Sequence, residues 1–365
     1  MVKKKGVIFR WTTLICAVYL TISLIVNPET CMDAGRRAFG VCFDVIIPSL
    51  FPFFICSGLF SGLGFAKGCS KNLSPLMRPL FGIPGSGAIA LVLGVVSGYP
   101  MGAVCAADLY RTGECTKTEA ERMLAFCNNA GPLFVIGVVG CGFFKSKEIG
   151  YYLYVSHIVS AILTGMIFRF YQGKREKCIP MLTEGTDIKN KNIAMVIGNV
   201  FDNSISSILK VCAFVVIFSI FAKTLPDGKF KPIIHSLFEI TGGIESLAGM
   251  KTELVFKLVI TSFVLALSGV SIVLQVSSVI QPHGISIMPY VKGKIIQGSI
   301  SAVFTYLMVS RLPISRNVFA WNNHLSTLNF SPMAIFASSL CCCLIGIILI
   351  MGISFAFGRF RKCCR

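Results

Sequence analysis

Residues 97–132 read SGYPMGAVCAADLYRTGECTKTEAERMLAFCNNAGP. This stretch interrupts two apolar runs, first with glycine and proline at residues 97–100 and then with an asparagine pair, glycine and proline at residues 128–132. Irregular backbone is tolerated at membrane depth only where protein or a wet cavity surrounds it, because lipid cannot hydrogen-bond to free amides. Interrupted apolar segments are therefore the usual sequence sign of a transport site.

The composition argues against a water-soluble protein. The chain is 54% hydrophobic and 14% charged, whereas soluble domains carry about 25% charged residues. Apolar runs of about 20 residues, long enough to cross a bilayer, recur along the whole chain. We therefore expect an all-α polytopic membrane protein, located in a cell membrane, with about seven to nine transmembrane segments.

The predicted spans cover residues 7–26, 43–65, 120–144, 150–171, 200–222, 290–311 and 334–357. Two further apolar stretches, residues 86–110 and 255–282, each carry a Ser-Gly pair near the middle. Each can form one kinked span or a re-entrant hairpin, and the fold class that we expect contains two such hairpins.

The same two stretches indicate an internal repeat. The interval from Gly98 to Gly113 equals that from Gly269 to Gly284, and similarity between two halves is typical of transporters. If both stretches turn back, each half has an odd number of crossings and the repeat is inverted. The predicted parts are an N-terminal span and loop (1–42), a first repeat (43–171), a polar linker (172–199), a second repeat (200–357) and a basic tail (358–365).

The net charge of +18 resides largely in short loops and at the two ends of the chain. This distribution is typical of topology signals and of contacts with anionic lipid head groups, so we expect a lipid bilayer and not nucleic acid as the partner. The basic, apolar N-terminus resembles a signal peptide but lacks a small-residue cleavage motif, and we interpret it as a retained first span.

No enzyme or metal motif is visible. The 16 cysteines contain no CxxC pair, and only four scattered histidines accompany them, so neither a metal ion nor another cofactor is predicted. HExxH and GxSxG are absent, and we expect a protein without enzymatic activity.

The first candidate site for a solute is the break formed by Ser97, Gly98, Tyr99 and Pro100. Pro100 supplies no N–H and Gly98 tolerates unusual torsions, so a helix is expected to end here. The freed carbonyls and amides can meet a polar solute, as the ends of half-helices do. The alternative is a packing kink, since glycine and proline are frequent in membrane helices.

Six other polar or helix-breaking residues join this candidate site. The amides of Asn128 and Asn129 can bind a solute or hydrogen-bond between helices. Lys210 lies within a predicted span, where an ionisable residue is a functional candidate by default, although its side chain can also snorkel to the membrane surface. Ser268 and Gly269 form the second break, and Gln275 is a weaker polar candidate beyond it. With Gln275 the list of predicted site residues is complete.

Four sequence blocks carry a family resemblance. They are PSLFPFF at residues 48–54, PLMRPLFGIPGSG at 75–87, SGYPMGA at 97–103 and TKTEAERMLAFCNNAGPLFVIGVV at 116–139. With these blocks the chain resembles the sporulation integral membrane protein family YlbJ, also called SpoVV, which carries the nucleoside-recognition Gate domain. The resemblance covers roughly residues 40–310 and is looser in the second half.

This resemblance implies a function and a fold. Family members are thought to move dipicolinic acid from the mother cell across the outer forespore membrane during sporulation. Gate domains also occur in concentrative nucleoside transporters and bacterial iron(II) transporters, which share hairpin-containing inverted repeats. We therefore expect a transporter of a small anionic solute, most simply dipicolinic acid. A nucleoside or ion transporter of the same fold and a structural membrane scaffold in spore formation are the alternatives, and the sequence leaves a homo-oligomer open.

Overall fold

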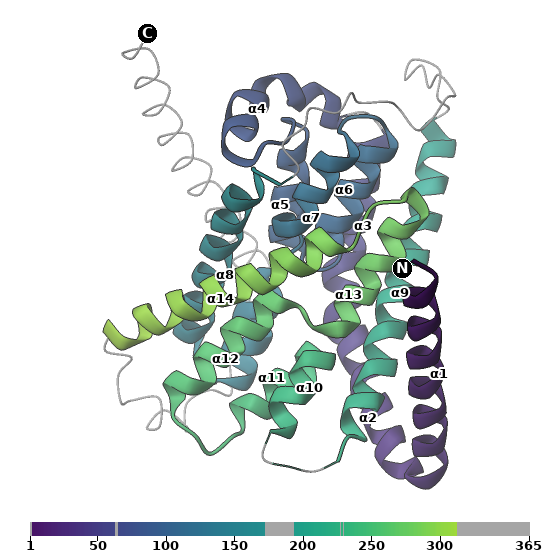
Figure 1. Cartoon of the computed structure of the whole chain (residues 1–365), viewed down its shortest axis with the longest axis vertical. Helices are drawn as coiled ribbons and strands as arrows, with labels where there is room; N and C mark the ends of the chain where they lie inside the picture. Colours follow the sequence, from purple (N-terminus) through teal and green to yellow (C-terminus); the bar gives the residue numbers. More distant parts are fainter. Residues whose placement is uncertain (1, 63–64, 172–192, 227, 229, 312–365) are drawn as a thin grey trace.

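The computed structural model describes residues 2–62, 65–171, 193–226, 228 and 230–311. The predicted span at 334–357 and most of the predicted linker lie outside the described residues. The described part is helical throughout and has no strand (Figure 1). Its elements are α1 (Val2–Val26), α2 (Pro28–Val41), η1 (Cys42–Ile46), α3 (Ile47–Gly62), α4 (Phe65–Phe81), α5 (Gly87–Ser97), α6 (Met101–Arg111), α7 (Lys117–Cys127), η2 (Leu133–Phe143), α8 (Lys147–Phe168), α9 (Ile193–Lys223), α10 (Lys231–Phe238), α11 (Ile240–Ala248), α12 (Leu254–Leu267), α13 (Gly269–Ile280), η4 (Gln281–His283) and α14 (Met288–Arg311).

The first Ser-Gly segment is a helical hairpin. Helices α5 and α6 pack against each other, and Gly94 faces Gly102 so closely that a Cβ on Gly94 would lie 3.0 Å from the Gly102 Cα. Gly98 turns the chain at φ 99° and ψ −171°, a conformation that glycine alone adopts readily. Each helix has only 11 residues, about 16 Å, so neither can cross the apolar core of a bilayer by itself.

The next segment is a broken helix. Helix α7 begins at a capping box, in which the Thr116 hydroxyl accepts from the Glu119 N–H at 3.2 Å and the Glu119 carboxylate accepts from the Thr116 N–H at 2.8 Å. It ends at Cys127, residues 128–131 are not helical, and η2 continues the segment as a wide π-helix. The predicted span at 120–144 is therefore interrupted at Asn128 and Asn129.

The second half repeats this order of elements. Helices α10 and α11 form a second short hairpin, α12 and α13 form a broken helix with its break at Ser268, and α14 follows as a long helix. In the first half the corresponding elements are α5 with α6, α7 with η2, and α8. Long helices α3 and α9, which precede the two hairpins, pack against each other.

The predicted alignment of the two Ser-Gly pairs is corrected by this arrangement. Gly98 lies at a hairpin tip, but Gly269 lies in a helix break, because Ser268 and Gly269, with φ of 72° and 66°, displace the helix without reversing it. Leu254–His283 remains one apolar segment of 30 residues, long enough to cross a membrane. The second hairpin is formed instead by α10 and α11, a segment that the sequence analysis left between spans. Inversion of the two halves stays a prediction.

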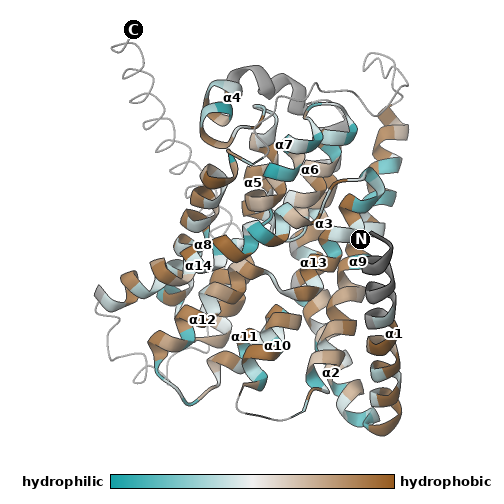
Figure 2. Ribbon diagram, in the orientation of Figure 1, coloured by the Kyte–Doolittle hydropathy of each residue, from teal (hydrophilic) through white to brown (hydrophobic). Residues whose placement is uncertain are grey.

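Part of the described chain can cross a membrane by length and composition. Helix α8, helix α9 and Leu254–His283 meet this test, and a bent pair, Leu14–Val26 with Pro28–Asp44, gives up to 4 such segments. The ribbons of α1, α9 and α12 carry long apolar stretches, whereas hydrophilic residues gather around α4 and α7 (Figure 2). Large apolar side chains are exposed on α1, α8 and α9, as expected of a lipid-facing surface.

We predict that Gly94→Ala destabilises the protein. A Cβ at this position would lie 2.9 Å from the carbonyl carbon of Cys127 and closer still to its oxygen, and overpacking of this kind costs about 1–3 kcal/mol or more. The thermal unfolding midpoint in detergent should fall. Gly198→Ala is the matched control, because nothing lies within 4 Å of its added Cβ; equal midpoints for the two variants would contradict the hairpin packing.

Candidate functional site

A cavity of about 600 Å³ lies between the two hairpin tips, the helix break of the first half and helix α13 of the second half. We call it the central cavity. From the first half it is lined by Ser97, Gly98 and Tyr99 of the hairpin tip and by Ala130, Gly131 and Pro132 of the break. From the second half it is lined by Glu239, Ile240 and Thr241 of the hairpin tip and by Ser271, Ile272 and Gln275 of α13.

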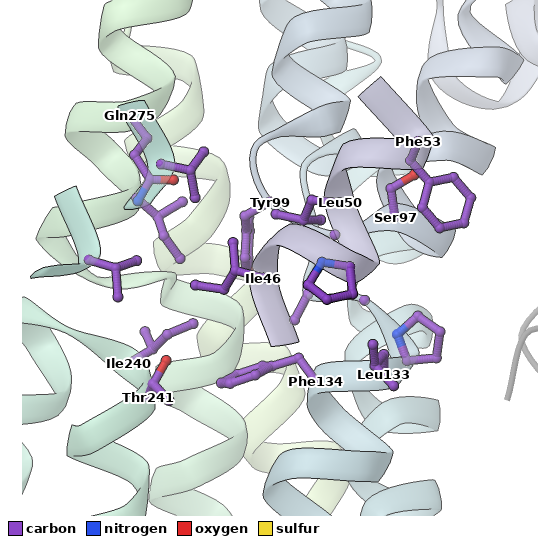
Figure 3. A pocket seen from close by; sticks show the side chains of 18 of the residues that line it. Ile46, Leu50, Phe53, Ser97, Tyr99, Leu133, Phe134, Ile240, Thr241 and Gln275 are labelled. Carbon is purple, nitrogen blue, oxygen red and sulfur yellow. The ribbon is translucent and has the colours of Figure 1, made fainter. Parts of the chain in front are cut away.

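The walls of the central cavity are mostly apolar. Phe53, Phe134 and Ile240 point into it, and the hydroxyls and the amide of Ser97, Thr241 and Gln275 are spaced around them (Figure 3). The Ser97 Oγ is buried and has no hydrogen-bond partner in the described part of the chain. Apolar walls with a few polar groups, enclosing 300–1,000 Å³, are typical of small-molecule sites.

Each hairpin tip packs against the break that follows it. In the first half, a Cβ on Gly98 would lie 3.0 Å from the Gly131 N, and in the second, a Cβ on Gly269 would lie 3.2 Å from the Leu237 O. The Tyr99 hydroxyl donates to the Leu265 carbonyl at 2.8 Å, which ties the first tip to the second half. The cavity is thus bounded by backbone that approaches closely at glycine.

Glu239 is the acidic group of the second tip. Its carboxylate is 3% exposed and accepts hydrogen bonds at 2.8 Å from the Thr241 N–H and the Gly242 N–H, capping α11. Burial raises the pKa of the Glu239 carboxyl, and these two hydrogen bonds oppose that rise. His235 lies beside it, since a Cβ on Gly242 would be 3.2 Å from the His235 Nε2 and 3.5 Å from the Glu239 Oε2.

A second cavity of about 570 Å³ adjoins the first and shares Val211 and Gln275 with it. We call it the polar cavity. Its charged and titratable lining consists of Asp108, Arg111, Lys210 and His283. Arg111 and Asp108 form an ion pair at 3.3 Å, so the Lys210 ammonium gives this lining a positive balance.

The asparagine pair does not line either cavity. Asn128 and Asn129 are fully buried and serve the protein itself. The Asn128 Oδ1 accepts from the Ala103 N–H at 3.4 Å, and its Nδ2 donates to the Tyr290 hydroxyl at 3.3 Å. The Asn129 Nδ2 donates to the Phe126 carbonyl at 2.7 Å. These amides therefore hydrogen-bond to groups of the protein itself, which the sequence analysis gave as the alternative to solute binding.

Lys294 of α14 is the functional candidate that sequence reasoning missed. It is 1% exposed, and its ammonium donates to the Gln297 Oε1 at 2.7 Å and to the Asn129 Oδ1 at 3.4 Å. The same Nζ lies 5.5 Å from the centre of the Tyr99 ring and 5.8 Å from that of Tyr290. In the described residues this ammonium forms no ion pair, so amide oxygens and aromatic faces alone stabilise it.

A signal for Lys294 was present in the sequence. The residue lies inside the predicted span at 290–311, where an ionisable side chain is a functional candidate. Gln297 follows it by one helical turn and therefore shares its face. Arg122, a second buried cation, donates to the carbonyls of Gly82 and Tyr171 at 2.7–2.9 Å and so joins the ends of neighbouring helices.

The structure thus divides the predicted site residues. Lining the central cavity are Ser97, Gly98, Tyr99 and Gln275, and lining the polar cavity are Pro100, Lys210 and again Gln275. Outside both lie Asn128, Asn129, Ser268 and Gly269, for which solute contact is not supported. The Ser268 Oγ hydrogen-bonds the Tyr290 hydroxyl at 2.6 Å, and Gly269 packs on the second hairpin. Within the described ranges no group of three or more His, Cys, Asp or Glu residues is placed to hold a metal ion.

The sequence of this chain is similar to that of a known protein. The sporulation integral membrane protein YlbJ of Bacillus subtilis (strain 168) is 29% identical over 328 residues, covering 80% of this chain and 80% of that protein. The chain is therefore similar to the YlbJ protein over most of its length. Its apolar helices and this relationship make it an integral membrane protein. No family model matches the chain, and no solved structure matches it significantly.

For this YlbJ relative we predict that Lys294→Met does not lower the thermal unfolding midpoint. An ammonium without a counter-ion is costly to bury, and methionine fills a similar volume without charge. Lys292→Met, which changes an exposed lysine two residues away, is the control for charge alone. A clear fall of the midpoint for Lys294→Met, with none for Lys292→Met, would show that the ammonium is a net stabiliser.

Proposed function

We propose that the chain is a transporter that carries a small polar anion through the central cavity. The observation that carries this proposal is the cavity itself, because two hairpin tips, the helix break of the first half and helix α13 of the second half form its wall. Broken helices at the middle of a membrane domain are how many transporters build a solute site. A membrane scaffold needs neither the breaks nor the cavity.

Helix ends support an anion as the solute. Two helical segments begin at the wall of the central cavity, η2 at Leu133 and α11 at Ile240. Each N-terminus brings partial positive charge, which favours anions. The unpartnered Ser97 hydroxyl and the Gln275 amide add hydrogen-bond donors that a carboxylate can accept.

The polar cavity supports an entry route for the same solute. It adjoins the central cavity at Val211 and Gln275, and the cations Arg111 and Lys210 outnumber the acid Asp108 on its wall. A positive lining raises the local concentration of anions and speeds their arrival. The two cavities together suggest a path from a basic vestibule to an apolar chamber.

The solute that we propose is dipicolinic acid, carried across the outer forespore membrane during sporulation. The relative is named a sporulation integral membrane protein, and the family resemblance supplies the substrate. A flat aromatic ring suits the apolar walls near Phe53 and Phe134, while its carboxylates suit the N–H and hydroxyl donors. The inverted relation of the two halves and their Gate-like character belong to this proposal.

Two assays test it. Spores of a deletion strain should contain little dipicolinate although the mother cell still makes it, and the wild-type gene should restore the content. Purified protein in liposomes should take up dipicolinate, and nucleosides should not compete. Competition by nucleosides would favour the nucleoside alternative; normal spore content together with no uptake would leave the scaffold alternative.

We predict that Gln275→Leu lowers dipicolinate uptake about 10- to 100-fold, because a lost hydrogen bond to a charged group or a buried unpaired group costs about 1–3 kcal/mol. Gln275 is the polar side chain shared by both cavities. Gln281→Leu, an exposed glutamine on the following turn, should leave uptake unchanged. Equal rates for both variants in liposomes of equal protein content would contradict the proposed path.

A further inference from the structure

An acid lines the cavity that is proposed for an anion. Glu239 is buried, faces the central cavity and makes no ion pair within the described part of the chain. It also occupies the N-terminus of α11, where both of its oxygens take N–H groups that an incoming anion could otherwise use. A bound dianion and an ionised Glu239 would repel each other in this apolar space.

Among the described residues no cation forms an ion pair with this acid. Burial, followed by Lys223 and Lys231, lowers the pKa of His235 to about 4, so its imidazole is neutral at pH 7. The other titratable groups of the surrounding elements are the thiols of Cys42 and Cys212, the acids Asp44 and Glu245, and Lys257 of α12. The Lys257 ammonium is held by the Ala248 and Met250 carbonyls at the opposite end of α11. Segments α13 and η2 contribute no other charged side chain here.

We propose that Glu239 is a proton-binding site, and that the proton it takes up travels with the anion. This inference rests on the proposed function and adds its coupling ion. A proton from water binds a carboxylate oxygen of Glu239 and leaves with the solute on the other side. The protein is then a proton–anion symporter.

Protonation changes two properties of the site at once. It removes the negative charge that opposes the solute, and it leaves the carboxyl group one fewer strong acceptor for the Thr241 and Gly242 N–H groups. The N-terminus of α11 is then free to donate to the solute. Burial raises the pKa of the Glu239 carboxyl, which favours proton uptake at this position.

The direct test is the pH dependence of dipicolinate binding to the full chain in detergent or nanodiscs. A dicarboxylate stays fully ionised above about pH 6, because carboxyl groups ordinarily titrate near pH 4. For the wild type we expect the dissociation constant to rise about tenfold from pH 6 to pH 8, since binding takes up a proton. Glu239→Gln should bind with the low-pH affinity of the wild type at every pH.

Two further variants complete the design. Glu245→Gln removes an exposed acid from the same helix and should keep the wild-type pH dependence. Glu239→Ser keeps an N-cap acceptor for α11 without a titrating group, and it replaces Glu239→Gln if that variant does not fold. Retained pH dependence in a folded Glu239 variant would overturn the proposal.

A measurement without solute separates this inference from the proposed function. Infrared difference spectra of the reconstituted protein between pH 5 and pH 8 should show a carboxyl band that is absent in Glu239→Gln. If this band is present but dipicolinate does not bind, the proton site stands and the proposed substrate fails. If dipicolinate binds but the band is identical in the variant, transport stands and Glu239 is not the proton site.

Discussion

Every break in a helix that lies in apolar surroundings must satisfy its own backbone groups, and the architecture of this protein follows from that requirement. The break at residues 128–132 is served by side chains from two other elements: the Ala130 N–H donates to His157 of α8 at 3.1 Å, while the Asn129 Oδ1 accepts from Lys294 and Gln297 of α14. The hairpin tips close against the breaks at glycine, where backbone can approach backbone. The irregular segments are therefore gathered at one place, and the space left between them is the central cavity.

The asparagine pair links this requirement to the two halves of the chain. Asn128 joins the start of α6 to Tyr290, and Asn129 joins the break to α14. Since Tyr290 also bonds Ser268, a short chain of hydrogen bonds runs from the first hairpin to the break of the second half. An unsatisfied buried group costs about 1–3 kcal/mol, so each member of this chain restrains the next. The residues closest to the cavity are thereby positioned by residues that never touch it.

Local signals predicted much of this fold, and long-range contacts account for what they missed. Glycine and proline at residues 97–100 and 128–132 marked both breaks of the first half, because torsion and missing N–H groups are properties of the residues themselves. Whether a break reverses the chain or merely displaces it depends on packing, which is why Ser268 was mistaken for a hairpin tip. The hairpin of α10 and α11 has no Ser-Gly or Pro signal and is fixed by the close approach of Gly243 to Ser236. Lys294 could be recognised in the sequence as an ionisable residue in a span. Its partners are Asn129, 165 positions away, and Gln297, 3 positions away, and only the contact with Asn129 places it at the break.

Tyr99 has one further consequence. One face of the residue belongs to the wall of the central cavity, and its ring also covers the ammonium of Lys294, while its hydroxyl is held by Leu265. The Tyr99 ring therefore lies between the Lys294 ammonium and the central cavity. A displacement of the first hairpin that breaks the hydrogen bond from the Tyr99 hydroxyl to the Leu265 carbonyl would expose the Lys294 ammonium to the central cavity. The electrostatic potential inside the central cavity would therefore depend on the position of the hairpin. An anion in the central cavity would be attracted most strongly in the conformation in which the tyrosine has moved aside, so its binding would favour that conformation.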